Sequence, residues 1–486
     1  MQKRYCIKNA CCEMAAMCYL LFAVSCSRVE QYKMLDITPH IFPDYADITI
    51  PVNIAPLNFR IMEDGNKFMA RFATRLDSFD VYSSNDILIP AGKWKRLLRQ
   101  HAGESLSVSI FAKETTGWIR YRSLQLTISP EAVDPYIAYR LIEPGYEYWG
   151  KMGIYQRNLE SFDETPVIMN TLTDGNCMNC HSFCANNPQQ MLFHVRAQHA
   201  GTILFKDGEL SKLNLKTPDL VSVGVYPRWH PQGKYIAFSV NQTFQAFHSS
   251  GNHHIEVYDT SSDLIIYNTE TQTINYTAAI HSPAHFETFP EWSPDGKTLY
   301  FCSAPAKKMP DSYDSIKYDL LKVSFDPQTM TTGKRIDTVL SASAMGKSVA
   351  FPRISPDGKY MVVCLSSFGT FPIWHKDNDL YLLDLSTGLV EPANSINSDE
   401  SDSYHSWSSN GRWMVYGSRR IDGLYTRPYI AYFDSTGVFH KPFLLPQKRP
   451  LNHYNELLKS YNIPEFVTGK ITVSPQTLER TIKGTF

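Results

Sequence analysis

Residues 177–181, Cys-Met-Asn-Cys-His, carry the most specific chemistry in this sequence. The pattern Cys-x-x-Cys-His is that of c-type haem attachment, in which two thiols bond to the haem vinyl groups and the adjacent histidine ligates the iron. Chance would give about 0.006 such patterns in a chain of this cysteine and histidine content. The motif therefore predicts haem c on Cys177 and Cys180, with His181 as the proximal iron ligand.

Two other chemistries use the same residues. Cys177 and Cys180 could form a disulfide or a redox pair, although the thioredoxin-like version of this motif belongs in a βαβ setting that the surrounding sequence lacks. A metal site of three thiolates and one imidazole would add His181 and Cys184. Small cytochromes c place their motif on a helix, whereas Pro188 forbids a long helix here. The spacing alone leaves all three chemistries open.

The first 25 residues predict an export signal. A basic start, with Lys3, Arg4 and Lys8, precedes the short apolar stretch 14–24. The stretch ends in Ala-Val-Ser-Cys at 23–26, which resembles a bacterial lipobox, so Cys26 is expected to carry lipid and to hold the protein on a membrane. An ordinary signal peptide cut near residue 25 is the alternative.

The composition limits the partners and the cysteine chemistry. The net charge is −1, which argues against a general nucleic-acid binder. Beyond the N-terminus no apolar run approaches the ~18 residues of a membrane-spanning helix. After export and lipidation, an odd number of cysteines remains, so a pure disulfide scaffold is a poor account. These are Cys177, Cys180, Cys184, Cys302 and Cys364.

Internal repeats give the strongest signal of organisation. Each repeat has an aromatic residue, then Trp or Ile, then a turn with glycine, then alternating apolar residues, and a second strand pair follows. The four clear copies begin at Tyr226, Phe289, Phe351 and Tyr404. A fainter copy runs from 179 to 195, with Phe183 in place of Trp229. A sixth unit at 136–159 is expected to be closed by the C-terminal residues 471–475.

Four strands in each unit predict a β-propeller of five to six blades over residues 135–486. Residues 26–134 show a different pattern, with strands in which apolar and polar residues alternate and a single helical segment at 93–103. They predict an antiparallel, β-sandwich-like domain that spaces the propeller from the membrane. The chain is thus expected to be all-β, with a lipoprotein signal at 1–25.

The repeat alignment also places the motif. Because Phe183 matches Trp229, Cys180 and His181 match Tyr226 and Pro227 at the entry of an inner strand, near the central channel. The long loops after the second strands are expected on the same face, which indicates function rather than linkage. The histidines assigned to that face are His248, His253, His254, His285, His375 and His405, whereas His230 is assigned to the opposite face. Candidates for a sixth iron ligand are Met191, His248 and His375.

The repeats resemble the TolB-type, WD40-like propeller repeat, most closely in the segments from Phe289 and Phe351. With its lipobox and Cys-x-x-Cys-His motif, the whole chain resembles Gram-negative envelope lipoproteins described as cytochrome-c-related. The resemblance implies a periplasmic or outer-membrane protein, anchored by lipid, in which haem c serves electron transfer or redox sensing toward a partner at the channel face. The alternative is a non-catalytic propeller that binds a protein or glycan and whose two cysteines form a disulfide. Enzyme activity is not expected, since no catalytic set is recognisable.

Overall fold

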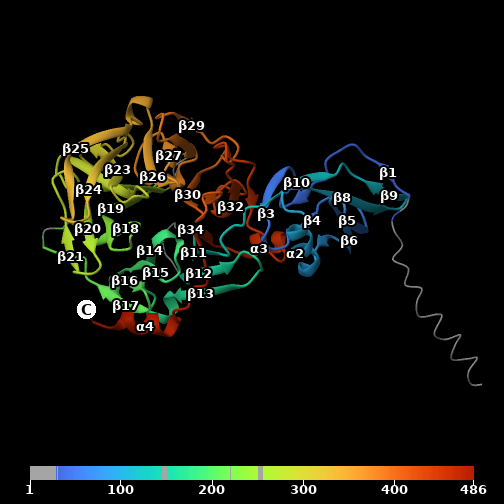
Figure 1. Ribbon diagram of the computed structural model, residues 1–486, viewed down its shortest axis with the longest axis horizontal. Coiled ribbons are helices and arrows are strands. Elements are labelled where there is room, and N and C mark those ends of the chain that lie inside the picture. Colours follow the sequence, from blue (N-terminus) through green and yellow to red (C-terminus); the bar gives the residue numbers. More distant parts are fainter. Residues whose placement is uncertain (1–28, 30, 145–149, 219, 250–254, 486) are drawn as a thin grey trace, which may run out of the picture.

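The computed structural model describes residues 29, 31–144, 150–218, 220–249 and 255–485 (Figure 1). The expected signal at 1–25 and the expected lipidation site Cys26 lie outside these residues. Strands dominate the described chain, which is all-β with a few short helices. None of the described helices is long and apolar enough to cross a membrane.

Residues 33–129 form two sheets and one helix. The larger sheet has the order β1-β9-β8-β10-β3, with β5 joined to β8 and β6 joined to β5. Its strands are β1 (Lys33–Met34), β3 (Ile48–Pro51), β5 (Lys67–Ala73), β6 (Ser78–Ser83), β8 (Ser105–Glu114), β9 (Gly117–Arg120) and β10 (Leu124–Ser129). The smaller sheet contains β2 (Ile41–Phe42), β4 (Phe59–Ile61) and β7 (Asp86–Ile87), and the helix is α2 (Ala91–Gln100).

The expectation of a purely antiparallel N-terminal region was wrong. Strand β3 pairs with β10 in parallel, and β1 pairs with β9 in parallel. Two parallel neighbouring strands must be joined by a long crossover connection. The chain between β3 and β10 is such a connection, because it passes through the smaller sheet before it returns to the larger sheet at β10.

Residues 136–467 form six four-stranded antiparallel sheets. The first three are β34 (Ser460–Val467), β11 (Tyr136–Ile142), β12 (Gly153–Asn158), β13 (Glu164–Met169); β14 (Met178–Phe183), β15 (Gln190–Val195), β16 (Gly201–Lys206), β17 (Glu209–Leu213); and β18 (Gly224–Trp229), β19 (Tyr235–Phe247), β20 (Ile255–Asn268), β21 (Thr273–Asn275). The others are β22 (His285–Trp292), β23 (Thr298–Pro305), β24 (Asp319–Asp326), β25 (Thr331–Leu340); β26 (Ser348–Ile354), β27 (Tyr360–Ser366), β28 (Asp379–Asp384), β29 (Val390–Pro392); and β30 (Asp402–Trp407), β31 (Trp413–Ser418), β32 (Arg427–Tyr432), β33 (Phe443–Leu444).

The first strand of each sheet lies at a common centre (Figure 1). These inner strands contact one another in the cyclic order β34, β14, β18, β22, β26, β30 and back to β34. Sheets that radiate from a closed ring of inner strands make a β-propeller. The fold is therefore of the β-propeller type, as the repeats predicted.

The C-terminal part of the chain closes the ring, but not with the predicted residues. Strand β34 pairs with β11, so residues 460–467 complete the sheet that begins at Tyr136. Residues 471–475 instead lead into α4 (Pro475–Lys483), which packs on β13, β16 and β17, while the short α3 (Pro450–Glu456) precedes β34. With β34 in place, all six sheets of the ring have four strands.

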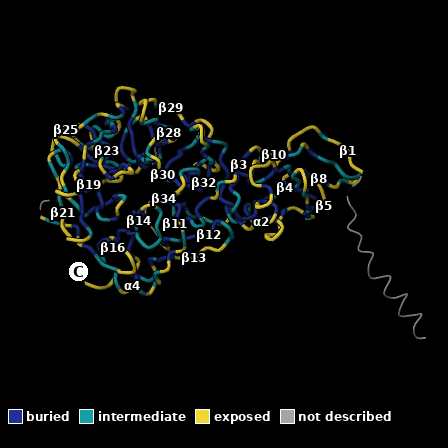
Figure 2. The backbone as a smooth tube through the Cα atoms, in the orientation of Figure 1, coloured by how far each residue is buried: buried dark blue, intermediate teal, exposed yellow. Residues whose placement is uncertain are grey.

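Equivalent residues occupy equivalent places in the repeats. The indole nitrogens of Trp229, Trp292 and Trp407 each donate to a backbone carbonyl of the preceding inner strand, at 3.3, 3.1 and 3.1 Å. Phe183 pairs with Met191 as Trp229 pairs with Ile236, so the fainter copy is aligned as predicted. Buried residues, in dark blue, are concentrated in the inner strands, whereas the outermost strands β21, β25 and β29 are mostly intermediate or exposed (Figure 2).

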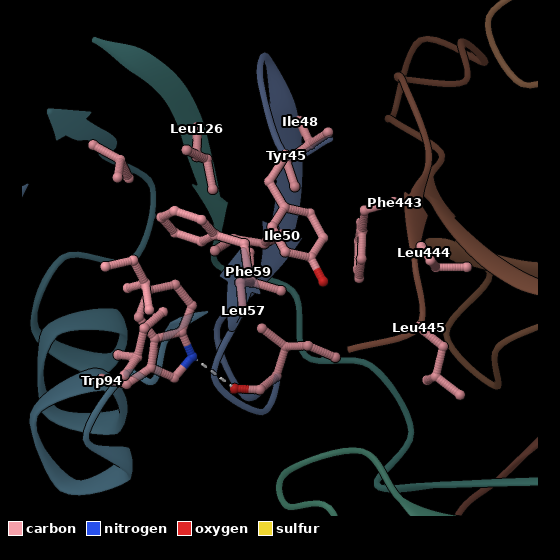
Figure 3. Packing of buried hydrophobic residues seen from close by; sticks show 14 of the residues in the cluster. Tyr45, Ile48, Ile50, Leu57, Phe59, Trp94, Leu126, Phe443, Leu444 and Leu445 are labelled. Carbon is pink, nitrogen blue, oxygen red and sulfur yellow. Dashed lines mark hydrogen bonds between the residues drawn. The ribbon is translucent and has the colours of Figure 1, made fainter. Parts of the chain in front are cut away.

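One hydrophobic core joins the N-terminal region to the last sheet of the propeller. Tyr45, Ile48 and Ile50 face Phe443 and Leu444 (Figure 3), and all of these residues belong to a single buried cluster. Trp94 of α2 closes the far side of this cluster, where its indole donates to the carbonyl of Ile54 at 3.0 Å. The two parts therefore share a continuous apolar core.

Removing one repeat tryptophan tests the equivalence. Trp292 is buried against Phe325 and His230, with ring centroids 4.8 and 5.0 Å apart. We expect Trp292→Ala to lower the free energy of unfolding by about 3–5 kcal/mol in urea titration, because it leaves a large cavity between two sheets. Trp118→Ala, at a half-buried position on β9, is the control, and equal losses in the two variants would contradict the assignment.

Candidate functional site

Each inner strand carries a two-residue bulge at the same place. There the pairing register shifts and two residues stand opposite one residue of the next strand. The first residue of each bulge has a φ between 48° and 54°, in the left-handed region. The six bulges are Cys180-His181, Tyr226-Pro227, Phe289-Pro290, Phe351-Pro352, Tyr404-His405 and Ile463-Pro464.

The first residues of the bulges form what we call the channel ring: Cys180, Tyr226, Phe289, Phe351, Tyr404 and Ile463. Its aromatic members contact one another in sequence, with centroid distances of 4.6, 4.4 and 5.2 Å from Tyr226 to Tyr404. All six line a small cavity of about 30 Å³, together with Arg353 and Glu465. That volume holds roughly one water molecule. The ring therefore closes the centre of the propeller.

His181 occupies the position that is proline in four of the six bulges and histidine in one other. That other histidine, His405, donates from Nε2 to the carbonyl of Val362 on the second strand of the preceding sheet, at 2.8 Å. The ring of His181 lies correspondingly beside the backbone of Ala138, on β11 of its preceding sheet. A histidine at this position can thus serve packing between sheets.

Burial controls the protonation of the motif. Burial, aided by Arg140, lowers the pKa of His181 to about 3, and burial raises the pKa of the Cys180 thiol. Neither ring nitrogen of His181 makes a well-formed hydrogen bond in the described structure, although the backbones of Ala138 and Ile463 lie close to the ring. At neutral pH this site therefore holds a neutral imidazole beside a protonated thiol.

A larger cavity of about 590 Å³ lies at the mouth of the channel, and we call it the channel-mouth cavity. Cys177 lines it, just before β14, and Asn241, Thr243 and Phe244 line it from the long hairpin of β19 and β20. Tyr226 and Tyr404 line both this cavity and the small one, so the channel ring separates the two.

The three groups of c-type haem attachment do not face one common space in this conformation. Cys177 lines the channel-mouth cavity, whereas Cys180 and His181 line the small cavity, which has no room for a porphyrin. The residues as placed do not fit one haem, and haem c stays a prediction from the motif.

The three candidate sixth ligands lie away from both cavities. Met191 is in the apolar core with Phe183, and His248 stacks near Tyr313 beyond the end of β19, with centroids 6.1 Å apart. His375 is buried, and its Nε2 lies 2.9 Å from a carboxylate oxygen of Glu256. In this conformation the structure brings none of them to His181.

The alternative metal site is not assembled either. Cys184 lies with its thiol 3.7 Å from the carbonyl of His230, in a different apolar cluster from the motif. Within the ranges that the structure describes, no group of three or more His, Cys, Asp or Glu side chains is arranged to hold a metal ion.

The remaining histidines divide as follows. Residues 373 and 374 line the channel-mouth cavity with Cys177, so the segment before His375 is on the predicted face. His285 is exposed at the start of β22, and His253 and His254 lie outside the described residues. His230 is buried in a turn and donates from Nε2 to the carbonyl of Gly296 at 3.0 Å. A Cβ at Gly296 would meet this ring at 2.1 Å, which explains why that turn needs glycine.

Arg140 is the main site residue that the sequence analysis missed. It lies on β11, lines the channel-mouth cavity and is only 7% exposed. Its Nη1 donates to Oδ1 of Asn179, a residue of the motif, at 2.6 Å. A charge within the apolar run Tyr-Ile-Ala-Tyr-Arg-Leu-Ile at 136–142 was the available signal, because such a residue is rarely buried without a role.

Comparisons with known proteins show no family for this chain. No protein-family model and no curated protein sequence matches the chain. A puromycin-hydrolyzing peptidase of Mycobacterium tuberculosis is 12% identical, with a TM-score of 0.36, over 72% of this chain and 52% of the peptidase. An oligogalacturonate lyase from Vibrio parahaemolyticus is 11% identical, with a TM-score of 0.32, over 59% of this chain and 84% of the lyase. A DUF4784 family protein from Bacteroides caccae is 10% identical, with a TM-score of 0.31, over 76% and 97% of the two chains.

The chain thus spans about half of the peptidase. Similarities at these TM-scores carry no functional weight. The β-propeller rests instead on the chain's own six sheets, and the resemblance to TolB-type repeats stays a prediction from the sequence.

A proline substitution tests whether His181 is a repeat position. We expect His181→Pro to fold with a thermal midpoint close to wild type, because proline stands at the matching position of four other bulges. Ser182→Pro is the control, one residue further into the strand, where proline removes ladder pairing with Leu192 and should cost about 3 kcal/mol or more. Equal destabilisation by both substitutions would refute the equivalence.

Proposed function

We propose that this chain is a non-catalytic binding protein of the Gram-negative cell envelope, built as a six-bladed propeller behind an N-terminal β-domain. Its ligand occupies the channel-mouth cavity. The observation that carries the proposal is the cavity itself, whose volume of about 590 Å³ falls in the range of ligand sites in proteins. Anchoring through Cys26 is part of the proposal and is supported by the lipobox-like sequence.

The walls of the cavity suit a small molecule or a short projecting group. Five aromatic side chains line it, and the polar groups among them include three arginines and three asparagines. Apolar and aromatic walls with a few placed polar groups are typical of ligand sites. The aromatic residues are Tyr226, Phe244, Phe371, Trp374 and Tyr404.

In this proposal the Cys-x-x-Cys-His segment belongs to the scaffold. Cys180 completes the channel ring and His181 packs on the preceding sheet, as their counterparts do in the other repeats. Both thiols are free in the structure, and a disulfide between Cys177 and Cys180 would be compatible with a scaffold role.

Haem c attachment is the competing proposal. It is supported by the motif and by the two ring nitrogens of His181, which make no well-formed hydrogen bond in the described structure. It would require β14 to leave its place, since the thiols line different cavities. The binding proposal needs no such rearrangement, and we therefore prefer it.

Blocking the cavity tests the binding proposal. Ala200 is exposed and lines the cavity mouth, so Ala200→Trp should obstruct it. The probe is 8-anilino-1-naphthalenesulfonate, a flat and largely apolar anion whose fluorescence rises in apolar sites. We expect wild type to bind the probe saturably, and Ala200→Trp to lose at least tenfold in affinity.

The control is Ala91→Trp, at an exposed position on α2 in the N-terminal region. It should bind the probe like wild type. If both tryptophan variants retain wild-type affinity, the probe does not enter the cavity, and the binding proposal fails.

A further inference from the structure

We propose that the ligand of the channel-mouth cavity carries an oxyanion, a carboxylate or a phosphate, that binds Arg140, and that this anion is attached to a flat, largely apolar body. The inference rests on the proposed function, because it names the chemical class that the same cavity would accept. Three features carry it: the charge of Arg140, which no described carboxylate pairs, the way the motif fixes that side chain, and the aromatic wall around it.

Arg140 is a buried charge that no carboxylate pairs among the residues that the structure describes. More than nine-tenths of the residue is shielded from solvent, and its Nε has no hydrogen-bond partner in the described structure. Among the described residues, no carboxylate lies within ion-pair distance of its guanidinium. An isolated buried cation is strongly unfavourable, and proteins normally pair such groups or use them to bind anions. An anion in the cavity would supply the missing partner.

The motif holds the guanidinium in one orientation. Oδ1 of Asn179 accepts from Arg140 Nη1 at 2.6 Å and also from the backbone N–H of Cys180 at 2.9 Å. On the other side lies the side-chain amide of Asn462, whose oxygen accepts from Nη2 at 3.0 Å when the amide is turned so that both of its ends are satisfied. Both terminal nitrogens are thus oriented by neutral groups, which leaves the positive charge of the guanidinium uncompensated among the described residues, and Nε is buried without a hydrogen-bond partner. Asn179 is a positioning residue for Arg140.

The charges around the cavity are mostly positive. Arg196 and Arg419 line it together with Arg140, and Glu143, the one carboxylate among the described lining residues, is paired with Lys459 at 2.8 Å. Burial, with the nearby Arg196, lowers the pKa of His194 to about 4, so this lining histidine is neutral at pH 7. Behind this wall the carboxylate of Asp259 accepts hydrogen bonds from Asn241 and Thr243. Among the described lining residues, positive charges outnumber negative ones, which favours an anion in the cavity.

Aromatic side chains define the rest of the ligand. Phe244 reaches the cavity from the long hairpin and is 48% exposed, and Phe371 and Trp374 face the same space from the loop after β27. Trp374 carries the guanidinium of Arg419 on one face, 3.7 Å from the ring centroid. A flat apolar body between such walls would bury apolar area while its anion reaches Arg140.

The test measures displacement of the fluorescent probe by three ligands that share a phenyl ring and differ in charge. Benzoate and phenyl phosphate carry the oxyanion, whereas benzamide is neutral. We expect both anions to displace the probe at concentrations about 10- to 100-fold lower than benzamide, which is the range expected for one hydrogen-bonded charge pair. Whichever anion binds more tightly identifies the oxyanion.

Two variants locate the effect. Arg140→Met removes the charge, and Asn179→Asp keeps the shape of Asn179 but provides an internal carboxylate that pairs with Arg140. Each should also weaken the anionic probe, so the variants are compared by direct calorimetric titration, in which benzoate and phenyl phosphate should bind about 10- to 100-fold more weakly while benzamide is unchanged. Because Asn179→Asp is nearly isosteric, it guards against a folding defect in Arg140→Met. Arg99→Met, at an exposed position on α2, is the matched control and should change nothing.

The inference is overturned if benzamide displaces the probe as well as benzoate does. It is also overturned if Arg140→Met and Asn179→Asp both keep wild-type affinity for the anions. In either case, loss of probe binding in Ala200→Trp would still support the binding proposal, so the two failures can be told apart.

Discussion

A two-residue bulge in each of the six inner strands decides where the side chains of the channel point. Every bulge begins with a residue in the left-handed region, although none of the six is glycine. That conformation costs about 1–2 kcal/mol for each residue. The packing around the channel must therefore compensate for this cost at all six positions. The bulge turns its first side chain toward the centre, and the six side chains together close it.

The bulge gives the Cys-x-x-Cys-His segment a structural role that the spacing of its residues alone does not predict. Cys180 lies where other repeats have an aromatic residue, and His181 lies where they have proline or histidine. Asn179, the residue before the bulge, reaches the guanidinium of Arg140 instead of contributing to the ring. One short segment therefore closes the channel, packs against the preceding sheet and orients a charge in the cavity above.

Much of the fold was predictable because each repeat carries its own local signals. A tryptophan, a turn and a strand of alternating apolar residues recur in each repeat. The alignment of Phe183 with Trp229 correctly predicted that Cys180 occupies the position equivalent to Tyr226. The closing strand was missed because residues 460–467 lack the turn and second strand of a repeat, and their partner β11 lies more than 300 residues earlier. The sequence Ile-Pro-Glu at 463–465 resembles Phe-Pro-Glu at 289–291 and was the overlooked signal.

The site was less predictable than the fold. Histidine candidates were chosen by loop position, but His375 is engaged with Glu256 and Met191 is in the apolar core, and neither arrangement has a local sequence signature. The importance of Arg140 depends on what lies near it in space, namely two asparagines from β14 and β34 and no carboxylate among the described residues. Contacts between residues so far apart in the sequence can be identified only from the three-dimensional structure.

The role of residues 177–181 as a repeat element is tested most directly by the intact mass and visible spectrum of the protein, produced in the periplasm together with a cytochrome c maturation system. We expect a mass without haem, with the two cysteines either free or joined in a disulfide, and no Soret band. A mass increased by one covalently bound haem, retained through denaturing electrophoresis and accompanied by a Soret band, would contradict that role. It would show that β14 leaves the ring before the protein reaches its functional state.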